Sequence, residues 1–248
     1  MNLSDLAAKG AVPIGLLAGY TLSPDPEWNA AFVRGLAEAI TAFDAPLLGG
    51  DTVSVLPGNP RSFGLTAIGR ADGPVPSRVG AKAGDALCVT GTIGDAGAGL
   101  RAALGQLDSP ALLARYRRPT PRLATGQALA PHVSAMMDVS DGLLIDAARM
   151  AEASGVGVEI DLALVPLSAA YIAACGDTLR SRLDASVAGD DYELLFATSH
   201  AALAHATDRY LPITRIGLVT KQPGLQLRSG TDPLPLPPAL GWEHRARL

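Results

Sequence analysis

The spacing of apolar residues predicts a long helix near the start of the chain. Apolar side chains recur every three or four positions between Trp28 and Phe43, directly after Asp25 and Pro26. This spacing places them on one face of a helix that an aspartate caps and a proline begins. A shorter helix is expected over residues 2–9, where Gly10 is a typical stop signal.

Short apolar runs bounded by Gly, Pro and Asp predict strands between the helices. Those expected in the first third of the chain lie at 13–22, at 45–55 with a Gly-Gly turn in the middle, and at 62–70. Those expected later lie at the start of 85–104, at 135–139, 156–165, the end of 189–198, 213–220 and 225–228. The proline-rich stretch 233–238 is not expected in a central strand, because proline cannot donate to the hydrogen-bond ladder.

Further helices are expected after the glycine-rich loop 90–99, on both sides of Pro119 and Pro121, and from about residue 141 to 153. Residues 71–85 are rich in Gly, Pro, Ser and Asp, which is typical of a linker. We therefore expect two domains, residues 1–80 and 81–248, in a mixed α/β (α+β) fold with helices packed against a sheet.

Composition narrows the possible classes of protein. The 248 residues carry a formal net charge of −4, and 48% of them are hydrophobic, which is typical of a globular protein. The pI of about 5.5 argues against a nucleic-acid partner. The densest basic run, residues 114–122, is interpreted as a solvated helix end in preference to a phosphate contact. No apolar run approaches the length of a membrane span, so no membrane partner is expected.

The two cysteines, Cys88 and Cys175, give no disulfide framework. Cys88 lies in an apolar run and is expected in the core. A reducing cytoplasm is the simplest setting for such a chain.

Acidic residues stand at element boundaries in four short motifs. They are Asp5 in "NLSD", Asp51 in "GGDT", Asp138 and Asp141 in "DVSD", and Asp190 and Asp191 in "GDD". Each of them could be an ordinary helix cap or turn residue, and Ser140 or Asp141 could cap the helix that follows.

Several clustered acids would be destabilising without a cation. Two carboxylates about 4 Å apart repel by about 1 kcal/mol in water and by about 4 kcal/mol at an effective dielectric constant of about 20. Oxygen ligands favour a hard cation such as Mg²⁺, particularly beside phosphates. Zinc is not expected, because four histidines and two cysteines are scattered along the chain.

The glycine-rich loop 90–99 could present backbone N–H groups to a phosphate, although tight packing between strand and helix explains it equally well. No G-x-S-x-G elbow is present, and no Ser or Cys has a neighbouring His, so a protein nucleophile is not expected. Phosphoryl transfer fits better, because positioning and charge stabilisation supply most of its catalysis.

Seven motifs carry a resemblance to a known family. In chain order they are "NLSDLAAKGAVP", "LLGGDT", "SRVGAKAGD", "VTGTIGDAGAGL", "RRPTPR", "MMDVSDGLLIDAARMA" and "AGDDYELLF". Together they resemble thiamine-monophosphate kinases, of the superfamily that includes aminoimidazole ribonucleotide synthetase. The resemblance implies the two-domain fold of that superfamily, a homodimer, and ATP- and Mg²⁺-dependent phosphorylation of thiamine monophosphate to thiamine diphosphate by direct in-line transfer.

The resemblance also implies roles for individual residues. The residues implied as Mg²⁺ ligands are Asp5, Asp51, Asp138 and Asp141. Those implied to contact the nucleotide are Gly50, Asp51, Arg78 and Ser140, and those implied to contact thiamine monophosphate are Asp190 or Asp191 and Trp242.

The resemblance further implies that about 70 residues normally precede the "NLSD" motif, and a chain that begins inside a packed element is expected to lose structure. We therefore expect a start assigned too late, with Met1 standing at an internal position. A chain that truly starts here is expected to show little or no kinase activity. Two alternatives remain: a catalytically silent thiamine-phosphate-binding or dimerisation module, and a sister enzyme that activates another substrate with ATP.

Overall fold

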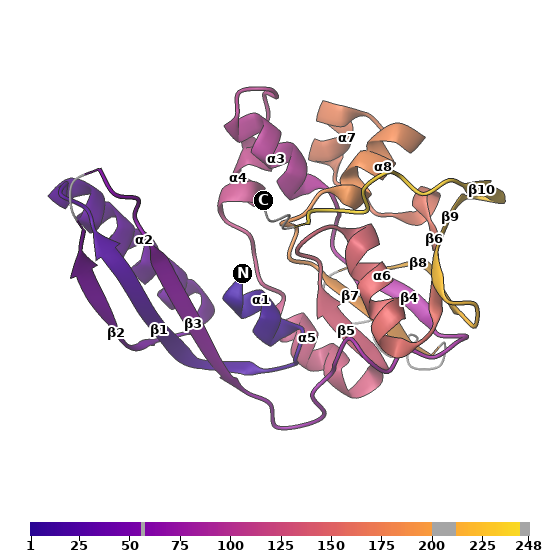
Figure 1. The fold of residues 1–248 in the computed structure, drawn as a ribbon, viewed down its shortest axis with the longest axis horizontal. Coiled ribbons are helices and arrows are strands. Elements are labelled where there is room, and N and C mark those ends of the chain that lie inside the picture. Colours follow the sequence, from indigo (N-terminus) through magenta and orange to yellow (C-terminus); the bar gives the residue numbers. More distant parts are fainter. Residues whose placement is uncertain (56–57, 200–211, 244–248) are drawn as a thin grey trace.

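The computed structural model describes residues 1–55, 58–199 and 212–243, which fold around two sheets (Figure 1). A three-stranded sheet with one long helix forms the N-terminal unit, and a seven-stranded sheet with most of the helices forms the C-terminal unit. Residues 71–85, which connect them, contain no helix or strand. The mixed helix-and-sheet class predicted from the sequence is confirmed.

The N-terminal unit has the strand order β2-β1-β3. Strand β1 runs parallel to β2 and antiparallel to β3, and helix α2 makes the crossover between β1 and β2. Its elements are β1 (Val12–Leu22), α2 (Pro26–Phe43), β2 (Leu47–Ser54) and β3 (Phe63–Arg70).

Helix α2 begins as the sequence predicts. The side chain of Asp25 accepts hydrogen bonds from the backbone N–H groups of Glu27 and Trp28, at 2.9 and 3.2 Å. The helix packs on the sheet through an aromatic cluster in which Phe32 lies 5.0 Å from both Tyr20 and Phe63, measured between ring centres. None of its residues is fully buried, so this unit has only a thin core.

The C-terminal unit has the strand order β10-β9-β6-β8-β4-β7-β5. Its strands are β4 (Ala86–Thr90), β5 (Ala135–Asp138), β6 (Gly157–Asp161), β7 (Leu194–Thr198), β8 (Ile213–Thr220), β9 (Gly224–Ser229) and β10 (Asp232–Leu234). Its helices are α3 (Asp95–Ala103), α4 (Pro110–Arg117), α5 (Leu123–Leu129), α6 (Leu143–Ser154), α7 (Ala169–Cys175) and α8 (Leu179–Val187), with short 3₁₀ turns at Ala130–His132 and Leu162–Leu164.

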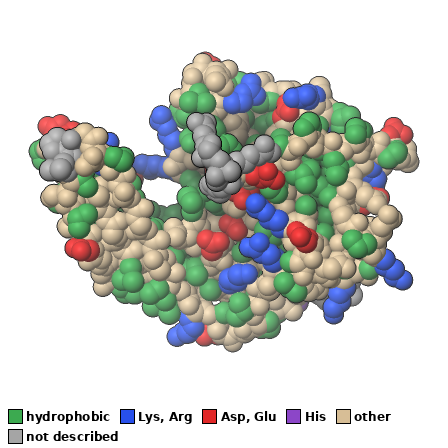
Figure 2. All heavy atoms as spheres, viewed as in Figure 1, with side chains coloured by type: hydrophobic (Ala, Val, Ile, Leu, Met, Phe, Trp, Pro, Cys, Tyr) green, Lys and Arg blue, Asp and Glu red, His purple; other side chains and the backbone are tan. Residues whose placement is uncertain are grey.

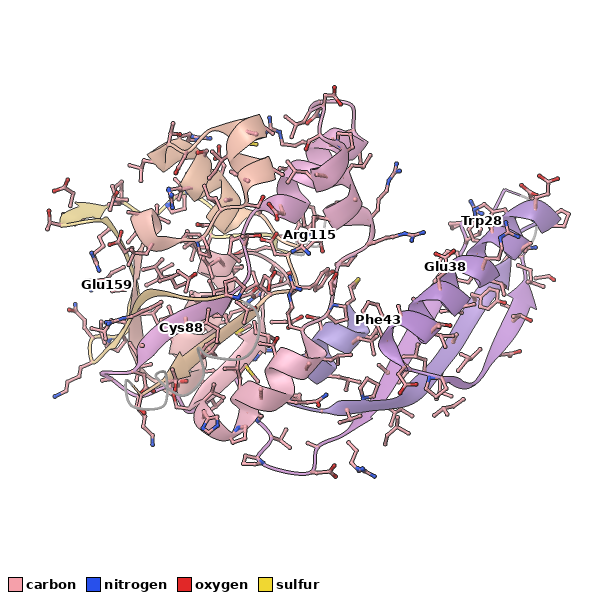
Figure 3. The ribbon with its side chains drawn as sticks, turned by 180° about the vertical axis from the view of Figure 1, so that it is seen from behind. Trp28, Glu38, Phe43, Cys88, Arg115 and Glu159 are labelled. Atoms are coloured by element: carbon pink, nitrogen blue, oxygen red, sulfur yellow. The ribbon has the colours of Figure 1, made fainter. Side chains whose placement is uncertain are left out.

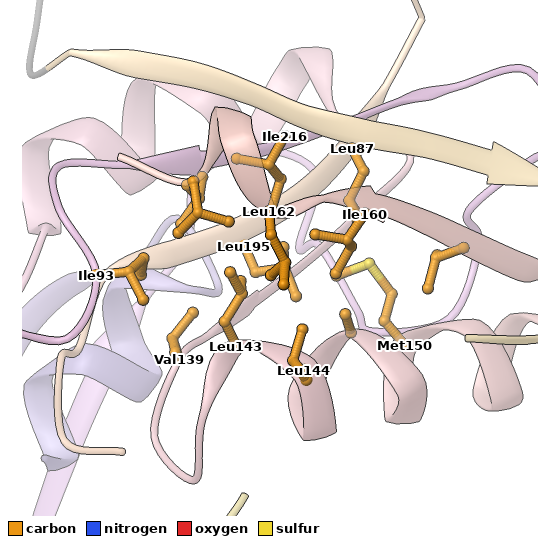
Figure 4. Packing of buried hydrophobic residues seen from close by; sticks show 14 of the residues in the cluster. Leu87, Ile93, Val139, Leu143, Leu144, Met150, Ile160, Leu162, Leu195 and Ile216 are labelled. Atoms are coloured by element: carbon orange, nitrogen blue, oxygen red, sulfur yellow. The ribbon is translucent and has the colours of Figure 1, made fainter. Parts of the chain in front are cut away.

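Each face of the large sheet is covered by helices. Helix α6 packs on one face through Leu143, Leu144 and Met150, which contact apolar side chains of the strands (Figure 4). Helices α5 and α1 (Asn2–Ala7) cover the other face. A Cβ atom on Gly126 of α5 would lie 1.9 Å from the carbonyl oxygen of Ala7, so glycine permits the close approach of these two helices. The N-terminal helix is thereby fixed beside β5.

Two expectations are corrected by the structure. The Gly-Gly pair at 49–50 does not form a turn but continues strand β2. The expected strand 156–165 ends at Asp161 and continues as a 3₁₀ turn. Strand β10 contains Pro233 and lies at the edge of the sheet, in agreement with the expectation that this proline-rich stretch does not join a central strand.

Candidate active site

Four of the predicted acids line one cavity of about 700 Å³. They are Asp5 on α1, Asp138 at the end of β5, Asp141 in the loop before α6, and Asp190 in the loop before β7. The other lining residues are Met1, Ala96, Gly97, Leu100, Ser140, Val187, Ala188, Gly189, Tyr192, Gly241 and Trp242. Figure 2 shows acidic and basic side chains gathered near the centre of the face that is turned to the viewer.

Backbone hydrogen bonds bring these segments together. The N–H group of Asp190 donates to the carbonyl oxygen of Ser140 at 2.8 Å, and that of Tyr192 donates to Val139 at 2.9 Å. On the other side, the N–H group of Trp242 donates to the carbonyl oxygen of Asp141, also at 2.8 Å. The loop between β5 and α6 is therefore the common support for two segments that are distant in sequence.

A residue that sequence reasoning missed, Asp146, holds this loop. Its fully buried carboxylate accepts hydrogen bonds from the N–H groups of Ser140 and Asp141, at 2.9 and 3.1 Å. Arg149 donates to both Asp141 and Asp146, at 2.5 and 2.9 Å. The only sequence signal for Asp146 was an acid inside an otherwise apolar helix face, five residues after Asp141.

The electrostatics around Asp138 favour a cation. Burial raises the pKa of the Asp138 carboxyl, and the nearby charge of Asp5 raises it further. The Ser4 hydroxyl lowers this pKa somewhat, but its geometry falls short of a full hydrogen bond. Among the described residues, Ser4 Oγ is the one buried side-chain polar atom without a hydrogen-bond partner.

These donors fit a hard cation by their chemistry. Carboxylate oxygens and an unpartnered hydroxyl are ligands of the kind that Mg²⁺ takes. Within residues 1–55, 58–199 and 212–243, however, no three His, Cys, Asp or Glu side chains are already arranged as metal ligands. The acids converge on one cavity without forming a finished coordination shell.

A second, smaller cavity of about 200 Å³ shares part of this wall. Asp5, Asp138, Ser140 and Asp141 line both cavities, and the smaller one also has three basic residues. Its remaining lining residues are Ala8, Lys9, Arg78, Met137, Asp146 and Arg149. In such a cavity the basic side chains can donate to phosphate oxygens while the carboxylates bind a cation.

Gly50 and Asp51 lie elsewhere. Both belong to β2, and Asp51 lines a separate cavity of about 370 Å³ on the three-stranded sheet. A Cβ atom on Gly50 would lie 1.8 Å from the carbonyl oxygen of Ala18. Within this chain, the close packing of β2 against β1 thus accounts for a glycine at position 50. Asp51 does not lie in the cavity that the other acids line.

Asp191 differs from its neighbour Asp190. Its buried carboxylate accepts hydrogen bonds from the N–H groups of Gly94 and Ala96 at the start of α3, at 2.7 and 3.1 Å. Burial raises the pKa of Asp191 to about 8, although these two hydrogen bonds act to lower it. Two of the N–H groups that could have received a phosphate in the loop 90–99, those of Gly94 and Ala96, are thus occupied by the protein's own carboxylate.

The basic run 114–122 contributes to a buried ion-pair network. Arg122 donates to the fully buried Glu193 through Nε at 2.8 Å and also through Nη2. Arg115 of α4 (Figure 3) donates to the same carboxylate at 3.3 Å. Arg117 and Arg118 match the expected solvated helix end, since both are exposed, and Arg118 forms an exposed pair with Glu38.

Fold and site together define a class: a mixed helix-and-sheet protein whose carboxylates and basic side chains surround two adjoining cavities suited to phosphate groups. Within the described chain, no helix is both long and apolar enough to cross a bilayer.

Comparisons with known proteins identify the family. Residues 1–71 match the family model of the AIR synthase related protein, N-terminal domain, and residues 82–230 match that of its C-terminal domain. The thiamine-monophosphate kinase of Caulobacter vibrioides is 40% identical over 98% of this chain and 72% of its own length. That of Escherichia coli K12 is 37% identical over 89% of this chain and 70% of its own length.

Solved structures of related proteins resemble this chain in fold. Thiamine-monophosphate kinase from Stenotrophomonas maltophilia has a TM-score of 0.82 and 35% identity, covering 91% of this chain and 75% of that one. AaThiL complexed with AMPPCP and TMP has a TM-score of 0.84 and 28% identity, covering 98% and 77%. The chain therefore belongs to the thiamine-monophosphate kinase family of AIR synthase related proteins.

Proposed function

We propose that this chain binds ATP and thiamine monophosphate and transfers the γ-phosphoryl group of ATP to the phosphate of thiamine monophosphate. One observation carries the proposal: Asp5, Asp138, Asp141 and Asp190 converge with Trp242 on one cavity of about 700 Å³. The names of the relatives and the neighbouring complex with AMPPCP and TMP support the choice of substrates.

We propose that transfer is direct and in line. A phosphate oxygen of thiamine monophosphate forms a bond to the γ-phosphorus, the bond to the β–γ bridging oxygen breaks, and ADP leaves with that electron pair. Mg²⁺, bound by Asp5, Asp138 and Asp141, would neutralise the charge that develops on the phosphate oxygens. No protein nucleophile is required.

The remaining residues align the two substrates. Arg78 lines the smaller cavity, where its guanidinium can donate to phosphate oxygens of ATP, and Ser140 lies on the shared wall. Asp190 and the ring of Trp242 would contact thiamine monophosphate, because Asp190 lines the larger cavity whereas Asp191 is buried against α3.

We also propose a homodimer, formed through the open face of the N-terminal sheet, which is the face that helix α2 does not cover. Asp51 lies on this face beside two exposed apolar residues, Leu17 and Val53. Exposed apolar side chains along a thin sheet are typical of an interface. Sedimentation should show two copies for the natural chain and one copy for Leu17→Asp; a monomeric natural chain would refute this proposal.

The kinase proposal is tested by incubating the chain with ATP, Mg²⁺ and thiamine monophosphate and measuring thiamine diphosphate. Asp141→Asn should abolish product formation, since the variant removes a proposed Mg²⁺ ligand. Asp184→Asn is a matched control, because Asp184 forms an exposed pair with Arg180 on α8 and lines neither cavity. Equal rates in both variants would reject the assignment of Asp141.

One observation favours a second candidate, a binding module without turnover. Asp51 and Gly50 lie outside the cavity that holds the other acids. Binding of thiamine monophosphate in calorimetry, with no product in the assay above, would select this candidate, and consumption of ATP with another acceptor would select a sister activity.

A further inference from the structure

The loop that carries Asp190 has an unusual backbone. Asp190 and Tyr192 both lie in the left-handed region, with φ angles of 67° and 52°. An aromatic residue with this backbone is an outlier, and such residues persist only where the surrounding structure holds them. Strain of this kind concentrates at functional sites.

The loop is held from two sides. Its backbone N–H groups at 190 and 192 donate to the carbonyl oxygens of Ser140 and Val139. Asp191, between them, is buried against the start of α3. As a result, Asp190 and Tyr192 line the larger cavity, while Asp191 is directed into the protein.

The Tyr192 hydroxyl makes one specific contact. It donates a hydrogen bond to Oδ1 of Asp190 at 2.8 Å, and only 6% of the tyrosine is exposed. Burial raises the pKa of Tyr192, and so does the neighbouring charge of Asp190. The phenol therefore keeps its proton and remains a donor to the carboxylate.

We propose that Tyr192 is a positioning residue for the substrate: its hydroxyl fixes the carboxylate of Asp190 so that Oδ2 can receive a polar or cationic group of thiamine monophosphate. This inference rests on the proposed function. A hydrogen bond to a charged acceptor is stronger than one between neutral groups, and it selects one rotamer of a side chain that would otherwise be free to turn. The strained backbone at Asp190 and Tyr192 brings the tyrosine hydroxyl and the aspartate carboxylate, on either side of Asp191, within hydrogen-bond distance.

Tyr192→Phe tests the proposal, because it removes one hydroxyl and keeps the ring. Tyr171→Phe is a matched control: Tyr171 is similarly buried, donates to the Ser181 carbonyl oxygen at 2.8 Å, and does not line the cavity. Titration calorimetry with thiamine monophosphate alone should show binding about tenfold weaker for Tyr192→Phe and unchanged for Tyr171→Phe. The KM for ATP should stay within about twofold of the natural value in both.

A double-mutant cycle separates positioning from direct contact. In an Asp190→Ala background, Tyr192→Phe should cause little further loss, because the acceptor that the hydroxyl positions is gone. An unchanged affinity in Tyr192→Phe would overturn the inference, and so would a full further loss in the Asp190→Ala background. Equal losses in both tyrosine variants would also overturn it, since they would indicate a general effect on folding. If the natural chain itself does not bind thiamine monophosphate, that result rejects the proposed function, independently of the role of Tyr192.

Discussion

Replacing Glu193 by glutamine should destabilise the protein strongly. Glu193 is fully buried and accepts hydrogen bonds from Thr90 at 2.7 Å, from two nitrogens of Arg122, and from Arg115 at 3.3 Å. Glutamine keeps the shape, but it removes the charge and points an amide N–H group at one or both arginines. Arg122 is itself nearly buried, so its charge would lose its partner without gaining water.

The size of the effect follows from that geometry. Breaking a buried ion pair by removing one partner costs about 3–5 kcal/mol, whereas the whole unfolding free energy of a domain is about 5–15 kcal/mol. For a chain of this length, the same loss corresponds to a fall in Tm of about 6–20 °C. Glu38→Gln is a matched control, because Glu38 pairs with Arg118 in an exposed position (Figure 3), where loss of the pair costs about 1 kcal/mol or less.

Urea unfolding of the natural chain and both variants measures these differences directly. The variant Glu193→Leu combined with Arg122→Met should recover most of the stability, because an apolar pair of similar volume removes both charges together. A loss below about 1 kcal/mol in Glu193→Gln would refute the reasoning, since it would show that water or rearrangement compensates Arg122. A double variant less stable than Glu193→Gln would refute it as well.

Three further predictions concern other parts of the molecule. Gly50→Ala should lower the free energy of unfolding by about 2 kcal/mol or more in urea, since its Cβ atom would lie 1.8 Å from the carbonyl oxygen of Ala18. Gly49→Ala is the control and should be tolerated, because the nearest atom to its Cβ would be 3.8 Å away. Equal losses of stability in the two variants would contradict the packing argument. Arg149→Met should cost about 1–3 kcal/mol in the same assay, because buried Asp146 loses a charged donor; an unchanged midpoint would contradict this. Burial raises the pKa of the Cys88 thiol from 9.0 to about 12. Between these pH values only the unfolded state loses the thiol proton, so the free energy of unfolding should fall by about 1.4 kcal/mol per pH unit. Cys88→Ala should remove this component, and the same slope of unfolding free energy against pH in the natural chain and the variant would refute the prediction.

Local signals predicted some elements well and missed others for identifiable reasons. Helix α2 begins at Pro26, as its aspartate cap and apolar spacing predict. The Gly-Gly pair was interpreted as a turn because the sequence cannot show that a neighbouring carbonyl occupies the space of a Cβ atom. Helices α7 and α8 were missed although Ser168 and Thr178 cap them. Both are short, and α7 has apolar residues throughout, so it shows no apolar–polar periodicity, while α8 carries only a weak apolar stripe.

The site shows a similar division. Motifs at element boundaries identified Asp5, Asp138 and Asp141, and the fold brings these side chains to one cavity. The sequence could not separate Asp190 from Asp191, since adjacent residues differ only in the direction that the backbone gives them. Asp146, Arg149, Tyr192 and Glu193 were missed because each acts through a partner that only the folded chain supplies.

The way in which the protein neutralises its own acids distinguishes structural carboxylates from those left for a ligand. Asp191 is satisfied by two N–H groups of α3, Glu193 by two arginines, and Asp146 by backbone N–H groups and Arg149. By contrast, Asp5 and Asp138 form no salt bridge within the part of the chain that the structure describes, and the charge of Asp5 raises the pKa of the Asp138 carboxyl. The charges of the Met1 amino group and of Lys9 act on both carboxylates, but within the described residues neither group forms an ion pair with them, so a bound cation would stabilise the pair further. The same cavity therefore has the electrostatic character that a cation held between phosphates would satisfy, which is the physical basis of the phosphoryl-transfer proposal.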